Sequence, residues 1–353
     1  MILPTSSQAT LLLLVLSMVC WGSWANTQKL AGKWRYELYC YDFAVGFLLL
    51  TVAAAFTLGS FNSAELTFQD NFLITGYRNM AYAAAAGIVF TVGNMFLSAA
   101  VSVAGLSAGF PIALGMALLV STAFGVLTGT QGSILLAVAG SGLVLAAIVV
   151  TTYAYSSHLD ALAEATKKDA LQLDPRTRQA KRAPRPPSAA KAVVLGVLSG
   201  IALGLFRPLV GLARESDIGV APYGLALLFA GGMLPTALVL SPFFFNFPVT
   251  GGPLGLRDYF RGSGRQHFLG LLGGMVAGVA ILASFLATGA PSVVRAVPQT
   301  TFALLQSGTL LAVLWGLLAW REFKGASDRV RVLFVGMLIL YAAGITVLSV
   351  GQG

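Results

Sequence analysis

Long runs of uncharged, mostly apolar residues recur along the chain and are separated by short polar connections. The longest of these runs covers residues 79–157. Because a hydrocarbon core about 30 Å thick needs roughly 20 apolar residues per helix, this run has room for three membrane-spanning helices. Further spans are predicted at residues 9–28, 43–62, 192–212, 220–241, 268–288, 296–320 and 332–350. The pattern therefore predicts ten transmembrane helices.

The composition agrees with this pattern. Hydrophobic residues make up 57% of the 353 residues and charged residues only 10%, and the mean hydropathy is +0.81. A soluble domain of this length carries far more charge. The sequence therefore predicts an all-α integral membrane protein whose surroundings are the lipid bilayer.

Positively charged residues fall in alternate connections. All but four of the 22 Lys and Arg residues lie in the connections after the first, fifth, seventh and ninth spans. The four exceptions are Arg78, Arg207, Arg214 and Arg295. Since Lys and Arg are retained on the cytoplasmic side, this asymmetry predicts a multi-pass plasma (inner) membrane protein with both termini outside. It also accounts for the net charge of +9 without a nucleic-acid partner.

One long polar segment, residues 156–191, divides the chain. Its basic residues and its prolines predict a cytoplasmic linker between a first half, residues 1–155, and a second half, residues 192–353. Each half holds an odd number of predicted helices, so the second half enters the membrane from the opposite side. Two inverted five-helix repeats result, an architecture typical of secondary transporters.

Glycines and prolines in the two halves support such a repeat. Pro111 is predicted to open the fourth helix, and Pro298 to interrupt the ninth. Interrupted helices in matching halves are where transporter binding sites tend to lie. The sixth span carries three glycines at four-residue spacing, which let another helix approach closely: Gly196, Gly200 and Gly204. Tight packing alone is the alternative explanation for these glycines.

Residues that carry catalytic or metal chemistry are scarce. The two cysteines, Cys20 and Cys40, lie on opposite sides of the predicted membrane, so we expect no disulfide between them. Together with His158 and His267 they offer no metal-ligand spacing. The sequence has no recognisable Ser/His/Asp set, paired carboxylates or phosphate-binding glycine loop. It therefore predicts no metal, no other cofactor and no enzyme activity.

Polar and aromatic side chains in the middle of predicted spans are candidates for solute binding, because they are costly in lipid unless they contact protein or line a cavity. Trp21 and Trp24 share one face of the first span, and Trp21 offers a flat surface for stacking on a ring. Asn94 has the donors and the acceptor that match the edge of a ureide or pyrimidine. Core packing and an interhelical hydrogen bond are the alternative roles for these residues.

Three further candidates lie in the second half. Gln299 and Gln306 offer the same amide chemistry in the ninth span, with Gln306 at middle depth. Arg207 lies some four-fifths of the way across the sixth span, at about 1.5 Å per residue. It attracts an anionic or carbonyl-rich solute if it faces a cavity, and it has no such role if it extends to the membrane surface.

Proton coupling has one candidate at the edge of a span, because no Asp or Glu lies in the middle of a predicted span. Asp42 opens the second span at its cytoplasmic end. Its sequence neighbours Lys33 and Arg35 favour an ordinary ion pair over a proton relay. Proton coupling through Asp42, another coupling ion and uncoupled facilitation all stay open.

Short motifs occur in nearly every span, in the order Trp21-Gly22-Ser23-Trp24, Thr57-Leu58-Gly59, Gly93-Asn94, Gly105-Leu106-Ser107, Ser199-Gly200-Ile201, Gly251-Gly252-Pro253 and Asp258-Tyr259. In this order they resemble the plant-type ureide permeases of the drug/metabolite transporter superfamily. The resemblance implies ten helices in two inverted halves and the uptake of small polar ring compounds such as allantoin or uracil, with protons. Arg207-Pro208 departs from this family, in which a small residue is expected before the proline.

The predicted function is therefore uptake of a small polar solute, a ureide- or nucleobase-like heterocycle, by alternating access. The alternatives are a sugar permease of the glucose, rhamnose or ribose type, and an exporter of drugs or metabolites from the same superfamily. Many multidrug exporters use an acidic residue in the middle of the membrane. Export is less favoured because no predicted span has such a residue. The sequence leaves the oligomeric state open, including a homodimer.

Overall fold

The computed structural model describes residues 1–61, 66–130, 132–172, 188–215 and 218–352, and every regular element within these ranges is a helix. The first half contains α1 (Ser7–Ser23), α2 (Ala25–Leu30), α3 (Tyr36–Phe56), α4 (Phe68–Ile74), α5 (Tyr77–Leu127) and α6 (Ile134–Gln172). The second half contains α8 (Ala189–Arg214), α9 (Pro222–Asn246), α10 (Leu256–Phe260), α11 (Gly264–Thr288), α12 (Pro298–Leu314), a π-helical turn (Trp315–Ala319) and α13 (Asp328–Val350). Nine helices within the described ranges are long and apolar enough to cross a membrane.

Helix α5 is one of these nine, but it consists of two arms that meet at Gly105. This glycine has a φ of 75°, a left-handed conformation that a residue with a side chain rarely adopts. The chain then turns back on itself. The close approach of the two arms shows this, since a Cβ atom placed on Gly109 would lie 3.2 Å from the backbone of Ala100. Each arm, residues 77–104 and 106–127, has the length that a bilayer span needs, about 20 residues.

The observed helix boundaries correct several sequence-based expectations. Helix α3 begins at Tyr36 rather than at residue 43, because the acidic side chains of Glu37 and Asp42 are buried in contact with partners and do not mark a connection. Pro298 is the first residue of α12 and does not interrupt it, since a first-turn residue needs no backbone donor. Pro111 lies inside the second arm of α5, which starts at Leu106.

The predicted linker, residues 156–191, is partly helical. Helix α6 continues through its first part to Gln172, and α8 begins at Ala189. The basic, proline-containing part at residues 173–187 lies outside the described residues.

Helix α8 fits closely against both arms of α5. Ser199 donates a hydrogen bond of 2.8 Å to the carbonyl of Gly93 in the first arm. On the side of the second arm, a Cβ atom added to Gly200 would lie 2.7 Å from the carbonyl oxygen of Ala113, and one added to Gly204 would lie 2.6 Å from Val120. The close approach predicted from the glycine spacing is therefore confirmed.

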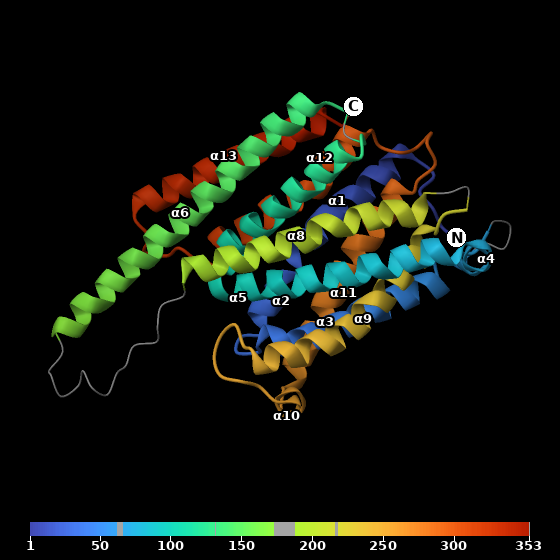
Figure 1. The fold of residues 1–353 in the computed structure, drawn as a ribbon. Helices are drawn as coiled ribbons and strands as arrows, with labels where there is room; N and C mark the ends of the chain where they lie inside the picture. The colour runs from blue at the N-terminus through green and yellow to red at the C-terminus, as the bar shows by residue number, and fades with distance from the viewer. Residues whose placement is uncertain (62–65, 131, 173–187, 216–217, 353) are drawn as a thin grey trace.

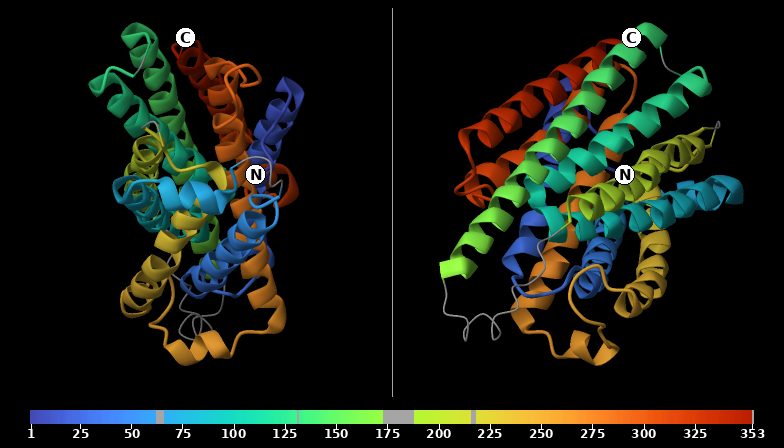
Figure 2. Two further views of the ribbon diagram at one scale, coloured as in Figure 1. Left: turned by 90° about the vertical axis from the view of Figure 1, so that its right-hand side faces the viewer. Right: turned by 60° about the vertical axis from the view of Figure 1, so that its left-hand side comes forward.

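The two chain ends lie on one side of the helix bundle. Figure 1 shows C towards the top and N towards the right, whereas the end of α6 and the start of α8 lie towards the left. The second view of Figure 2 shows the same separation. We call these two ends of the bundle the terminal side and the linker side.

Candidate functional site

A cavity of about 290 Å³ lies between α1, the second arm of α5, α8, α11 and α12. The residues that α8 and α11 contribute come from the parts of these helices that run towards the terminal side, Leu203 to Arg214 and Ala280 to Thr288. The cavity therefore occupies the terminal half of the bundle. Its polar lining residues are Ser17, Ser121, Arg207, Arg214, Ser284, Thr288 and Gln306.

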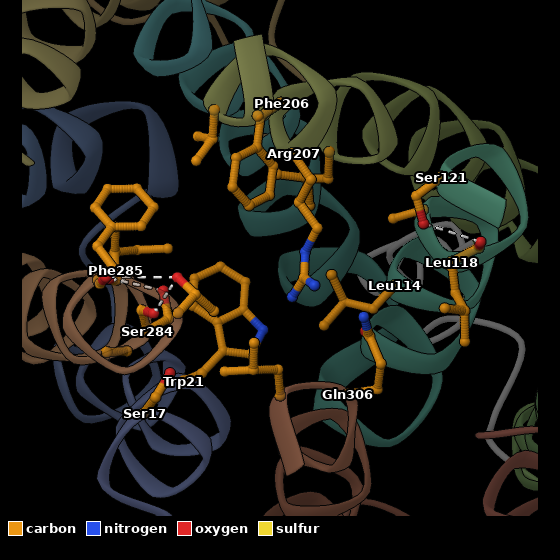
Figure 3. A pocket seen from close by; sticks show the side chains of 18 of the residues that line it. Ser17, Trp21, Leu114, Leu118, Ser121, Phe206, Arg207, Ser284, Phe285 and Gln306 are labelled. Atoms are coloured by element: carbon orange, nitrogen blue, oxygen red, sulfur yellow. Dashed lines mark hydrogen bonds between the residues drawn. The ribbon is translucent and has the colours of Figure 1, made fainter. Parts of the chain in front are cut away.

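Three of the residues singled out from the sequence meet in this cavity. Trp21 comes from α1, Arg207 from α8 and Gln306 from α12. Figure 3 shows the guanidinium group of Arg207 extending towards the space between the other two side chains. A planar ring, a cation with several donors and an amide thus face one small volume, which suits a flat polar solute.

Arg207 is exposed, and its guanidinium group is directed into the cavity rather than towards lipid. Among the residues that the structure describes, it makes no hydrogen bond or ion pair. Arg214, further along α8, donates a hydrogen bond of 2.8 Å to the hydroxyl of Thr288. The cavity therefore has two guanidinium groups.

Trp21 and Trp24 have different surroundings, although they share a helix face. The ring of Trp21 lies 5.8 Å from that of Phe90, measured between centroids, and also borders the cavity. Trp24 is fully buried, with Phe43 at 5.0 Å and Phe110 at 6.2 Å. Trp24 thus packs in the core and does not line the cavity.

The cavity lining includes neither Asn94 nor Gln299. Asn94 is buried in the first arm of α5, and its Oδ1 atom has no hydrogen-bond partner in the described part of the chain. Gln299 is the second residue of α12 and is half-buried near the terminal side. Depth along a span was readable from the sequence, but the direction in which each side chain points was not.

Asp42 belongs to a separate cluster near the linker side. Its carboxylate accepts a hydrogen bond of 2.7 Å from the hydroxyl of Tyr259 and lies 3.0 Å from Nδ1 of His267. The ion pair expected with a sequence neighbour is not formed, because Arg35 pairs with Glu37 instead. Burial and the hydrogen bond to Asp42 raise the pKa of Tyr259 above its usual value, so this phenol stays protonated and acts as a donor.

Glu322 forms a second linker-side cluster that the sequence analysis did not predict. Its carboxylate accepts hydrogen bonds of 2.8 Å from the backbone N–H groups of both Leu106 and Ser107, and one of 2.6 Å from the Ser107 hydroxyl. It also forms an ion pair with Lys29 of α2. We call Lys29, Glu322 and the start of the second α5 arm the linker-side clamp.

The clamp follows from the break in α5. The second arm begins at Leu106, where backbone N–H groups lack helical partners and attract a negative charge. Two glycines leave room for the carboxylate, since a Cβ atom on Gly105 would lie 2.5 Å from it and one on Gly316 would lie 2.6 Å from it. In the sequence, the only sign of the clamp was that Glu322 is an acidic residue between Arg321 and Lys324.

No protein-family model matches the chain. Three curated relatives from Arabidopsis thaliana are similar to it: ureide permease 4 is 22% identical over 398 residues, ureide permease 1 is 21% identical over 389 and ureide permease 5 is 23% identical over 411. The alignments cover 96%, 98% and 99% of this chain and 96%, 96% and 95% of the relatives. They confirm the predicted resemblance to ureide permeases, and with the membrane-length helices they indicate a multi-pass membrane transporter, not an enzyme.

Proposed function

We propose that this protein is a secondary transporter that takes up a small polar solute, a ureide- or nucleobase-like heterocycle, by alternating access. The observation that carries this proposal is the cavity in which Trp21, Arg207 and Gln306 converge within a ureide-permease-like chain. The ring of Trp21 would stack on the solute, and the amide of Gln306 would bond its carbonyl and N–H groups. The small volume of the cavity favours a solute of one or two rings.

The membrane arrangement that we propose has ten crossings, with the two arms of α5 counted separately. Residues 1–155 and 192–353 then contribute five crossings each, and the second half is inverted relative to the first. We propose on this basis that the protein belongs to the drug/metabolite transporter superfamily. We further propose that it lies in the plasma (inner) membrane with the terminal side outside, as the distribution of Lys and Arg predicts.

Alternating access requires the solute site to open to each side in turn. The cavity lies in the terminal half, and the clamp joins α2, α5 and the segment after the π-helical turn in the linker half. We assign the clamp to closure of the linker side in the conformation described. Release of Glu322 from Lys29 would then accompany opening towards the cytoplasm.

For coupling we retain Asp42 as the proton-binding residue. It is buried next to His267 and Tyr259, on helices α3, α11 and α10, so proton uptake by its carboxylate would weaken contacts between these elements. The coupling would act at a distance from the solute, since Asp42 does not line the cavity.

Uptake into liposomes tests this function. The purified protein is reconstituted and offered radiolabelled allantoin, uracil, xanthine, glucose, rhamnose and ribose, with and without an inward proton gradient. We expect accumulation of a nitrogen heterocycle that the gradient stimulates and that Gln306→Ala lowers. Asn246→Ala, which removes an exposed amide at the end of α9, is the matched control and should transport normally. Accumulation of a sugar alone would contradict the proposal.

A further inference from the structure

The described residues that line the cavity bring positive charge into it without a counter-ion. Arg207 and Arg214 both line it, and no Asp or Glu is among the described residues of its lining. Arg207 makes no hydrogen bond or ion pair within the described ranges, and the partner of Arg214 is the neutral hydroxyl of Thr288. A neutral solute would leave this charge uncompensated.

An unpaired guanidinium group at this depth is costly. Arginine keeps its positive charge under physiological conditions and does not become neutral by losing a proton. Charged side chains within membrane spans are generally paired or face a functional cavity. Because the described residues supply no anion at the cavity, a solute that carries a negative charge would supply the counter-ion.

We propose that the transported solute is a carboxylated heterocycle whose carboxylate pairs with Arg207. This inference rests on the proposed function and specifies its substrate class. The planar guanidinium group binds a carboxylate through two parallel hydrogen bonds. Trp21 and Gln306, which lie on either side of the Arg207 guanidinium group in Figure 3, then contact the ring.

Arg214 has a different part in this arrangement. It lies at the end of α8, nearer the terminal side than Arg207, and its guanidinium group is already held by Thr288. A fixed positive charge at the terminal-side end of the cavity raises the local concentration of anions there. Arg207 therefore determines which solute binds, and Arg214 favours its approach.

Matched solutes that differ only in a carboxylate test the proposal. The reconstituted full-length protein is offered orotate against uracil, and hydantoin-5-acetate against hydantoin, each in radiolabelled form. We expect the carboxylates to be taken up at least about tenfold faster than their neutral partners, the size expected for a close charge pair. Arg207→Gln should remove this preference. Arg207→Lys should retain part of it, because lysine keeps the positive charge but cannot form the two parallel hydrogen bonds of a guanidinium group.

Arg78→Gln is the matched control, because Arg78 lies near the terminal side but does not line the cavity. It should leave the preference unchanged. Uptake of uracil and hydantoin without their carboxylated partners would overturn the proposal while leaving the proposed function intact. Failure to transport any of the four heterocycles would instead contradict the proposed function. The preference of the unmodified protein decides the question even if the Arg207 variants fail to fold.

Discussion

Trp21 and Trp24 show how neighbouring residues of the same type take different roles. Trp21 borders the cavity and packs on Phe90, whereas Trp24 has no exposed surface and contacts Phe43 and Phe110. One indole is therefore available to a solute, and the other fills the space between α1, α3 and α5.

Substitution of these two residues should have different effects. Trp21→Ala should lower uptake about tenfold with a smaller loss of stability, because a stacking surface in the cavity is removed. Trp24→Ala should destabilise the fold by about 3–5 kcal/mol, because it leaves a large void in packed core. Uptake and thermal unfolding in detergent, measured on both variants, separate the two effects. Equal loss of stability with no selective loss of uptake for Trp21→Ala would contradict its assignment to the site.

At the scale of elements, the break in α5 makes the contacts of the linker-side clamp possible. Gly105 turns the chain, Glu322 accepts hydrogen bonds from the backbone N–H groups at the start of the second arm, and Lys29 compensates the carboxylate. Glu322 lies far from both partners in the sequence, so the three elements come together only in the folded chain.

Substitution of Glu322 should weaken this junction in graded steps. Glu322→Ala leaves backbone donors and Lys29 without their partner, and should cost about 3–5 kcal/mol, as for a broken buried ion pair. Glu322→Gln should cost less, because its amide oxygen still accepts from the helix start. Thermal unfolding and uptake should both follow the order wild type, Gln, Ala. If the two variants unfold at the wild-type temperature, the clamp has no structural role.

Much of the helix content could be predicted, since an uninterrupted run of about 20 apolar residues indicates a membrane-spanning helix. The start of α3 was missed because Glu37 and Asp42 are acidic and yet buried. Three candidate site residues, Trp21, Arg207 and Gln306, line the cavity. Asn94 and Gln299 lie at similar depths in the membrane spans but do not line it. Helix rotation separates the two groups, and it depends on contacts such as that of Ser199 with Gly93. The clamp could not be predicted, because Lys29 and Glu322 lie far apart in the sequence and no local pattern shows that they pair.

At the scale of the whole molecule, the cavity and the clamp occupy opposite halves of the bundle. Both chain ends lie on the side of the cavity (Figure 1). The proposed direction of transport therefore depends on which side of the membrane these ends face.

Labelling of single cysteines tests this orientation. Leu73→Cys places a thiol on exposed α4, at the terminal side, and Arg261→Cys places one after α10 near the start of α11. In intact cells a membrane-impermeant maleimide should label the first variant, and the second only after permeabilisation. The reverse result would show that the terminal side faces the cytoplasm.

The most direct test of the account is protection of a cavity residue by the transported solute. Ser284→Cys, in a variant with Cys20→Ser and Cys40→Ala, places one thiol in the cavity wall. A solute at about ten times its dissociation constant should slow labelling of this thiol about tenfold, because labelling then requires the unoccupied site. Labelling of Leu73→Cys in the same background should be unaffected. Unchanged labelling of the cavity thiol, in protein that still transports the solute, would show that the solute binds elsewhere.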